Sequence, residues 1–121
     1  MLIGELARQA GTSARTLRYY EAQGLVRPRR CANGYRDYDD TELRVVGEIR
    51  SLLAVGFGLE DIRPFVTCLR AGNPSGDICP DSISVLRRKL AEVDAGLARL
   101  AGVREQLRCQ LDRARADRRR R

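Results

Sequence analysis

The sequence predicts a mainly α-helical protein in which a winged helix-turn-helix domain with a two-stranded wing is followed by one long coiled-coil helix. Two short helical segments joined by a tight turn, residues 3–10 and 14–23, indicate the helix-turn-helix. Asn33-Gly34 indicates the wing, because both residues tolerate the positive φ of a tight hairpin turn. Apolar residues at alternating steps of three and four, beginning at residue 83, indicate the coiled coil.

The first two helices follow from their apolar spacing and their end residues. The first helix is amphipathic, with apolar residues at i, i+3, i+4 and i+7: Ile3, Leu6, Ala7 and Ala10. Gly11 is placed to end it. Thr12 or Ser13 caps the second helix, Leu17 is its inward anchor, and Gly24 ends it.

The wing is expected directly after this pair of helices. Pro28 holds the incoming chain extended, and residues 35–38 form the return strand. Because side chains alternate along a strand, Tyr35 lies on one face and Arg36 and Tyr38 on the other. One of the two tyrosines is therefore expected to pack inward while Arg36 reaches outward.

Two further helices support this domain. Asp39, Asp40 or Thr41 caps a helix whose apolar residues keep a helical period: Leu43, Val46, Ile49, Leu52 and Leu53. Gly56 and Gly58 break that helix. A fourth helix spans residues 59–70, with Pro64 in its first turns and its apolar residues facing inward: Ile62, Phe65, Val66 and Leu69.

A Gly/Pro/Asn/Ser loop at residues 71–78 marks the clearest boundary in the chain. The predicted divisions are a domain at 1–70, a linker with the start of the long helix at 71–81, a coiled-coil helix at 82–115 and a basic, disordered tail at 116–121. The seam of the coiled coil consists of Ile83, Leu86, Leu90, Val93, Leu97, Leu100, Leu107, Leu111 and Ala114, with Arg104 at the missing position. Such an apolar stripe needs a second copy of itself, so we expect a homodimer.

Positive charge is concentrated at the two ends of the chain. The net charge of the 121 residues is +7. Residues 1–36 contain seven Arg against two Glu, a net charge of +5, and residues 113–121 contain six Arg against one Asp, again +5. The middle, residues 37–112, has a net charge of −3. A basic cluster that coincides with a helix-turn-helix is typical of a nucleic-acid-binding protein, with salt-sensitive affinity.

Composition also argues against several other classes of protein. No apolar run approaches the roughly 20 residues that span a bilayer, and no secretion signal is evident, so we expect a protein in the cytoplasm, associated with the nucleoid and not with a membrane. The chain has no His, and no nucleophile lies beside a base and an orienting group, so we expect no enzyme. Four Cys without a C-x-x-C pair argue against a zinc knuckle, and the reducing compartment argues against a disulfide scaffold.

Four ordered motifs then give the chain a family resemblance: I-G-E-L-A-R-Q-A-G, T-L-R-Y-Y-E-A-Q-G-L-V-R-P, N-G-Y-R-D-Y and G-F-G-L-E-D-I-R-P-F. In order and spacing they resemble the MerR family of bacterial transcription regulators, over residues 1 to about 112. The resemblance implies a dimer joined by an antiparallel coiled coil. Such a dimer binds a pseudo-palindromic DNA sequence, the promoter dyad, in an unusually long spacer between two promoter elements. It also implies distortion of that DNA so that RNA polymerase can engage both promoter elements, which is indirect readout.

The resemblance also implies roles for individual residues. Arg15, Thr16 and Arg18 would face the major groove, where Thr16 could instead only pack against a base methyl group. Phosphates would be held by Tyr19 or Tyr20, by Tyr35 and by Arg36. For Tyr20 the alternative is a core position with only its hydroxyl directed outward.

The cysteines leave open which signal such a regulator would sense. Metal-sensing relatives place ligands in a loop after the dimer helix, and this sequence has no Cys, His or acidic pair there, so a metal would need a thiolate-rich site. Cys79 precedes Pro80 at the start of the long helix, where the helix dipole favours a thiolate, and either a metal ion or a thiol oxidant could act there. Cys68 is either its partner or a buried apolar thiol. Cys31 and Cys109 are expected to be incidental surface thiols.

Three functions are therefore compared. The first is a dimeric, sequence-specific transcription regulator whose cofactor is a thiolate-bound metal ion or none. The second is an architectural DNA-binding protein that senses nothing. The third, a thiol-based metal carrier or redox enzyme, is disfavoured because the sequence offers no evident general base.

Overall fold

The computed structural model describes residues 1–32 and 34–121, so Asn33 of the predicted hairpin turn lies outside the described residues. Five helices and a two-stranded sheet follow one another in the order α1, α2, β1, β2, α3, α4, α5. The chain divides into two units, Met1–Ile83 and Ser84–Arg121. Within the described residues, no helix is both long and apolar enough to cross a membrane.

The predicted helix-turn-helix is present. Helix α1 spans Ile3–Ala10 and ends at Gly11, whose φ of 71° is the left-handed conformation that Gly adopts without strain. Helix α2 spans Ala14–Ala22, so it ends one residue earlier than expected. Of the two candidate caps, Ser13 is the one used: its side chain accepts a hydrogen bond from the backbone N–H of Thr16.

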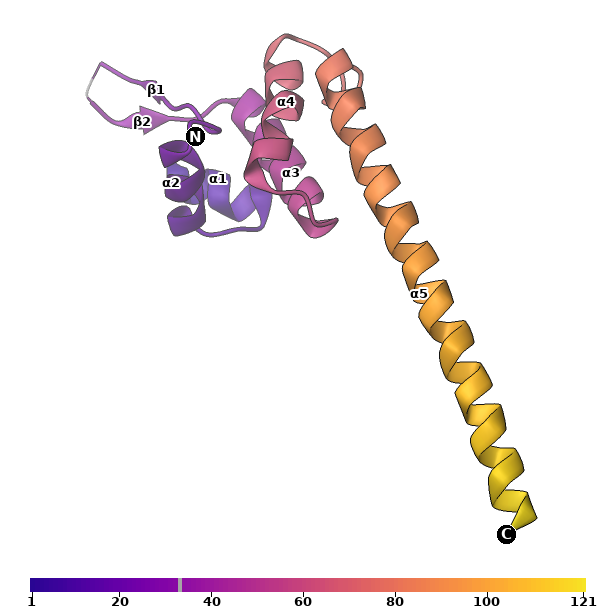
Figure 1. Ribbon diagram of the computed structural model, residues 1–121. Coiled ribbons are helices and arrows are strands. Elements are labelled where there is room, and N and C mark those ends of the chain that lie inside the picture. The colour runs from indigo at the N-terminus through magenta and orange to yellow at the C-terminus, as the bar shows by residue number, and fades with distance from the viewer. Residues whose placement is uncertain (33) are drawn as a thin grey trace. The chain divides into compact units, whose positions relative to one another are not determined.

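The wing is a short antiparallel hairpin beside α1 and α2 (Figure 1). Strand β1 is Arg29–Arg30 and β2 is Arg36–Asp37, and they pair in the register Arg29 with Asp37 and Arg30 with Arg36. The return strand is thus shorter than the predicted 35–38. Tyr38, which follows it, is the inward tyrosine, with only 1% of its surface exposed.

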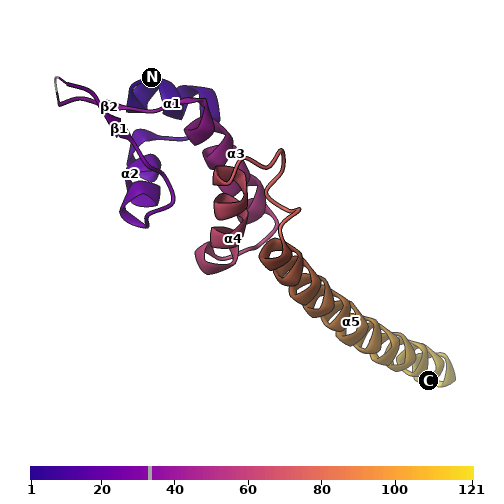
Figure 2. The same ribbon diagram turned by 90° about the horizontal axis from the view of Figure 1, so that it is seen from above.

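Helices α3, Asp40–Ala54, and α4, Leu59–Arg70, lie side by side in both views (Figure 1 and Figure 2). Asp39 is the cap of α3, and its side chain accepts from the backbone N–H of Glu42 at 3.3 Å. The core of this domain is formed by apolar side chains of all four short helices and the segment after α2: Leu6, Leu17, Leu25, Val26, Val45, Val46, Ile49, Ile62, Phe65 and Leu69. It holds α1, α2 and the wing as one body.

Helix α5 runs without interruption over 41 residues, Pro80–Arg120. At 1.5 Å per residue it is about 60 Å long. It therefore continues through most of the segment 116–121 that composition marked as a disordered tail. All eight predicted apolar seam residues from Ile83 to Leu111 are exposed in the single chain, by 37% at Ile83 and 63% at Leu100.

Candidate nucleic-acid interface

The outer face of α2 carries two exposed cations. Arg15 and Arg18 are exposed, and neither makes a hydrogen bond or ion pair with any residue that the structure describes. Tyr19, on the same helix, is 53% exposed. Leu17, completely buried, anchors the opposite face. The packing of α2 therefore leaves guanidinium and phenol groups directed to solvent, as a contact to phosphates and base edges requires.

The structure separates the two neighbouring tyrosines that the sequence left as alternatives. Tyr20 is only 5% exposed, and burial raises the pKa of its phenol. The ring belongs to the core because residue 20 lies three positions after Leu17 and so shares its face. Its burial therefore favours the core position for Tyr20 over a phosphate contact. Of these two tyrosines, Tyr19 has the phenol that a phosphate could reach.

Thr16 is occupied by the local structure of the helix start. Its Oγ1 lies 2.9 Å from Oγ of Ser13, while its backbone N–H donates to the same hydroxyl at 3.1 Å. The Thr16 side chain is half-buried. These bonds fix the first turn of α2, which positions Arg15 and Arg18.

The wing is fixed to α2 through Glu21. Arg36 Nη1 donates to Glu21 Oε2 at 3.1 Å, and the Tyr38 hydroxyl donates to the same oxygen at 3.1 Å. Arg36, predicted to hold a phosphate, is thus already paired, although 44% of its side chain remains exposed. Tyr35 is 66% exposed. Sequence reasoning did not single out Glu21, whose partners lie 15 and 17 residues away.

A hollow lies between the wing and α2. The cavity measures about 330 Å³ and is lined by Leu2, Ile3, Arg18, Gly34, Tyr35 and Arg36. Two of the predicted phosphate contacts and one predicted base contact therefore border one concave surface.

The N-terminus fastens the other edge of the wing. The Met1 ammonium donates to Asp37 Oδ1 at 2.6 Å and to the Tyr38 carbonyl at 2.9 Å. The hydrogen bond from this ammonium lowers the pKa of Asp37 below its ordinary value.

Sequence reasoning missed an ion pair between the buried Glu42 and the half-buried Arg70, which supports the chain that enters the wing. Glu42 of α3 is 5% exposed and accepts two hydrogen bonds of 2.8 Å from the Arg70 guanidinium of α4. It also accepts from the backbone N–H of Arg27 at 2.7 Å, and Arg70 Nη2 donates to the Leu25 carbonyl at 2.8 Å. Together Glu42 and Arg70 tie α3, α4 and the chain entering the wing to one another.

The two cysteines singled out from the sequence are brought together. Cys68 and Cys79 form a disulfide with a Cα–Cα distance of 5.9 Å, where composition had argued against disulfides. The pairing arises because the loop between α4 and α5 turns the chain back, and a spacing of 11 residues alone does not reveal that turn. Cys31 and Cys109 are free and exposed, as expected. Among residues 1–32 and 34–121, no three His, Cys, Asp or Glu side chains gather where a metal ion could bind.

Two short helices that expose Arg15 and Arg18, a short antiparallel wing and a long helix after them define a winged helix-turn-helix DNA-binding protein. Comparison with known families agrees with this class. Residues 1–67 match the family described as "MerR HTH family regulatory protein", and residues 43–110 match "MerR, DNA binding". The chain belongs to the MerR family of DNA-binding transcription regulators.

Similar proteins include the regulator HmrR of Rhizobium leguminosarum bv. viciae, 34% identical over 97 residues that cover 77% of this chain and 75% of HmrR. ZntR of Escherichia coli strain K12 is 34% identical over 106 residues, covering 87% of this chain and 74% of ZntR.

Two solved structures are similar in fold. One is PbrR691 from Ralstonia metallidurans CH34 in complex with lead(II), with a TM-score of 0.70 and 27% identity over 88% of this chain and 82% of that one. The other is HiNmlR, described as a MerR family regulator lacking the sensor domain, bound to promoter DNA. Its TM-score is 0.59, with 28% identity over 83% of this chain and 74% of that one.

Proposed function

We propose that this chain is a homodimeric, sequence-specific regulator that binds a promoter dyad through two copies of the α2–wing surface, working in the cytoplasm on the nucleoid. The observation that carries the proposal is the exposed pair Arg15 and Arg18, which has no partner among the described residues. Of the two, Arg18 lines the same cavity as Tyr35 and Arg36, and a concave surface with exposed guanidinium groups suits a polyanion with shaped grooves. The DNA-bound relative HiNmlR supports this reading.

The seam of α5 supports a second copy as the partner. Its ten positions, Arg104 included, are symmetric about the midpoint between residues 98 and 99. An antiparallel pair aligned on that midpoint uses every position: Leu97 faces Leu100, Leu90 faces Leu107, Leu86 faces Leu111 and Ile83 faces Ala114. These side chains are exposed in one chain and would be removed from water in the pair, and this burial of apolar surface makes the free energy of association favourable.

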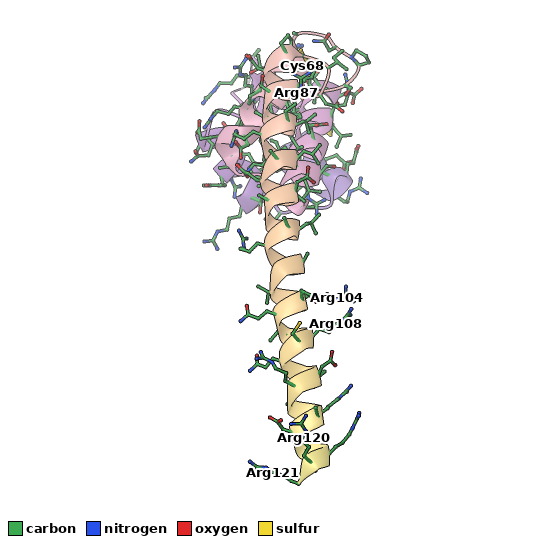
Figure 3. The ribbon with its side chains drawn as sticks, turned by 45° about the vertical axis from the view of Figure 1, so that its right-hand side comes forward. Cys68, Arg87, Arg104, Arg108, Arg120 and Arg121 are labelled. Atoms are coloured by element: carbon green, nitrogen blue, oxygen red, sulfur yellow. A yellow bond between two sulfur atoms is a disulfide. The ribbon has the colours of Figure 1, made fainter. Side chains whose placement is uncertain are left out.

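Arg104 supports the antiparallel orientation in particular. In a parallel, in-register pair it would face Arg104 of the second copy, and like charges in a seam repel. In the antiparallel pair it faces Val93 and lies beside Asp94 of the second copy. Arg104 and Arg108 project from the same side of α5 (Figure 3), so Asp94 would meet two cations there.

Regulation would act on the shape of the DNA. A dimer that binds DNA through two α2–wing surfaces can bend and untwist the base pairs between them without touching those base pairs, and the energy of that distortion depends on the sequence deformed. RNA polymerase would then read the altered spacing of the promoter elements. We assign the signal to Cys79, and its disulfide with Cys68 favours a thiol signal over a metal ion there.

The first part of the proposal, sequence-specific DNA binding, is tested on a DNA fragment that the protein itself selects from random sequences in vitro. Arg18→Ala should cost about 1–3 kcal/mol on that fragment and little on scrambled DNA, because a base contact is lost. Arg8→Ala is the matched control, since Arg8 is an exposed arginine of α1 already paired with Glu5. Fluorescence anisotropy at several salt concentrations measures both. Equal affinity of the unaltered protein for selected and scrambled DNA would refute sequence-specific binding.

The dimer is tested by sedimentation. Leu97→Glu places a charge at the centre of the seam and should give a monomer, whereas Ala98→Glu, on the outer face, should leave the dimer intact. Asp94→Lys should weaken the dimer, because it brings a third cation beside Arg104 and Arg108. A monomer in the unaltered protein at micromolar concentration would overturn the proposal.

A second function has one observation in its favour. Six of the last nine residues are Arg, and such a basic end suits an architectural DNA-binding protein that contacts phosphates without sensing. The two functions differ in cells: if Cys79→Ser leaves transcription unchanged under metal, oxidant and electrophile challenge, the architectural function is favoured.

A further inference from the structure

We propose that the Cys68–Cys79 pair is an exchange site for a low-molecular-weight thiol and its disulfide: the thiol opens the Cys68–Cys79 bond by attack at Cys79, and the disulfide of that thiol closes it again. This deepens the thiol signal assigned above, and only its read-out on DNA rests on the proposed function.

The pair borders a cavity of a suitable size. The cavity measures about 370 Å³, within the range of small-molecule sites, and both cysteines line it. Side chains of both charge signs share the lining, among them Glu60, Arg63 and Asp81. Such a lining suits a thiol that carries both ammonium and carboxylate groups, as peptide thiols do.

Burial decides which sulfur is attacked. Cys68 is 2% exposed, whereas Cys79 is half-buried. Thiol–disulfide exchange requires a thiolate to reach one sulfur atom, so access selects Cys79 as the attacked atom and Cys68 as the leaving group.

The surroundings also supply partners for the reduced form. Asn73 Nδ2 lies 3.5 Å from Cys68 Sγ and 3.3 Å from Cys79 Sγ, so one amide donor can stabilise a thiolate at either position. Cys68 Sγ lies 3.5 Å from the Ser75 carbonyl oxygen. A disulfide sulfur has no proton to donate there, but a reduced Cys68 thiol does. Cys79 also stands directly before α5, whose positive end favours a thiolate.

The chemistry is a reversible exchange. A thiolate RS⁻ attacks Cys79 Sγ, a bond forms between them, the Cys68–Cys79 bond breaks, and its electron pair leaves on Cys68 Sγ, which takes a proton. A second thiolate attacks the R sulfur of the mixed disulfide, RSSR departs, and Cys79 leaves as a thiolate. Two RSH are oxidised to RSSR while the protein disulfide is reduced to two thiols, and an excess of RSSR drives the same steps backward.

The disulfide stands where it can affect the dimer helix. It joins the last turns of α4 to the residue before α5. Once it is opened, the start of α5 keeps its non-covalent contacts, such as the bond of 2.6 Å from Ser82 Oγ to the Gly76 carbonyl. Opening therefore loosens the base of α5 without removing the loop that holds it.

The test uses the 121-residue chain carrying Cys31→Ser and Cys109→Ser, which removes both free, exposed thiols. The oxidised protein is titrated with glutathione, quenched with acid, alkylated and analysed by peptide mass spectrometry. We expect two new thiols per chain and a transient glutathione adduct on Cys79 alone. The single-cysteine variants are treated with glutathione disulfide instead, because a lone thiol forms a mixed disulfide only by exchange with a disulfide: Cys68→Ser should accumulate the adduct on Cys79, and Cys79→Ser should show none on Cys68.

Three results would overturn the exchange site: an adduct mainly on Cys68, equal adducts on both residues, or reduction by a protein dithiol but not by glutathione. On the selected DNA, oxidised and reduced protein should differ in affinity by about fivefold or more. Equal affinity would refute the role as signal. If neither form binds any selected DNA, the proposed function fails while the exchange result stands on its own.

Discussion

Breaking the Glu42–Arg70 pair, in which the carboxylate is buried, should destabilise this protein more than the loss of a surface ion pair does. The perturbation is Arg70→Met, which keeps an unbranched apolar side chain of similar reach but removes the guanidinium. It deletes both bonds of 2.8 Å to Glu42 and the bond to the Leu25 carbonyl. Glu42 then stays buried with the Arg27 N–H as its remaining donor outside its own helix.

The size of the effect follows from that arrangement. Removing one partner of a buried pair leaves an uncompensated charge, which costs about 3–5 kcal/mol. Glu42→Gln should cost less, about 2 kcal/mol, because the amide oxygen still accepts hydrogen bonds. In the double variant Glu42→Gln/Arg70→Met no buried charge is left unpaired, so the loss should fall short of the sum of the single losses by about 2 kcal/mol.

The assay is urea unfolding followed by circular dichroism, with all variants at one protein concentration because a dimer's stability depends on it. Arg8→Met is the matched control: it removes an exposed arginine whose partner Glu5 stands on the same helix, and no measurable shift is expected. A loss for Arg70→Met no greater than for Arg8→Met, or strictly additive losses in the double variant, would refute the reasoning.

Three further substitutions concern Glu48 of α3, Gly76 of the loop that precedes α5, and Gly47 of α3 as the control for Gly76. Burial, and then the carboxylate of Asp77, raises the pKa of Glu48 above its ordinary value of 4.5, so the folded state binds this proton more tightly than the unfolded chain. The free energy of unfolding should therefore rise as the pH falls through the raised pKa toward 4.5. Glu48→Gln should be more stable than the unaltered protein at pH 7. A series of unfolding measurements at different pH values should show that this variant lacks the rise. Gly76→Ala would place a Cβ 2.9 Å from the Phe65 carbonyl oxygen and should cost about 1–3 kcal/mol in thermal unfolding. Gly47→Ala, inside α3 with nothing within 4 Å, should instead stabilise by about 0.5–1 kcal/mol, and the same sign for both glycines would contradict the steric argument.

Helices and caps were predictable because their causes are local. The apolar period of α1, the cap at Ser13 and the break at Gly56 each depend on residues within one or two turns of one another. One local signal was not used: Tyr20 lies three positions after Leu17, and that spacing already places its ring on the buried face of α2.

The candidate interface was predictable only in part. The exposure of Arg15 and Arg18 was expected, but the engagement of Arg36 by Glu21 was not. That pair depends on how far the hairpin folds back over α2, which no residue spacing within either element specifies.

The sequence by itself determined the order and type of the elements, the basic reading helix and the palindromic apolar seam of α5, since each is a periodic or short-range property of the chain. Only the tertiary structure decided which charged groups pair with one another inside the protein and which cysteines meet. Glu42 meets Arg70 across 28 residues of chain, and Cys68 meets Cys79 across a loop that must first turn back. Such contacts follow from the packing of helices against a common core, and packing joins residues whose separation in sequence carries no period.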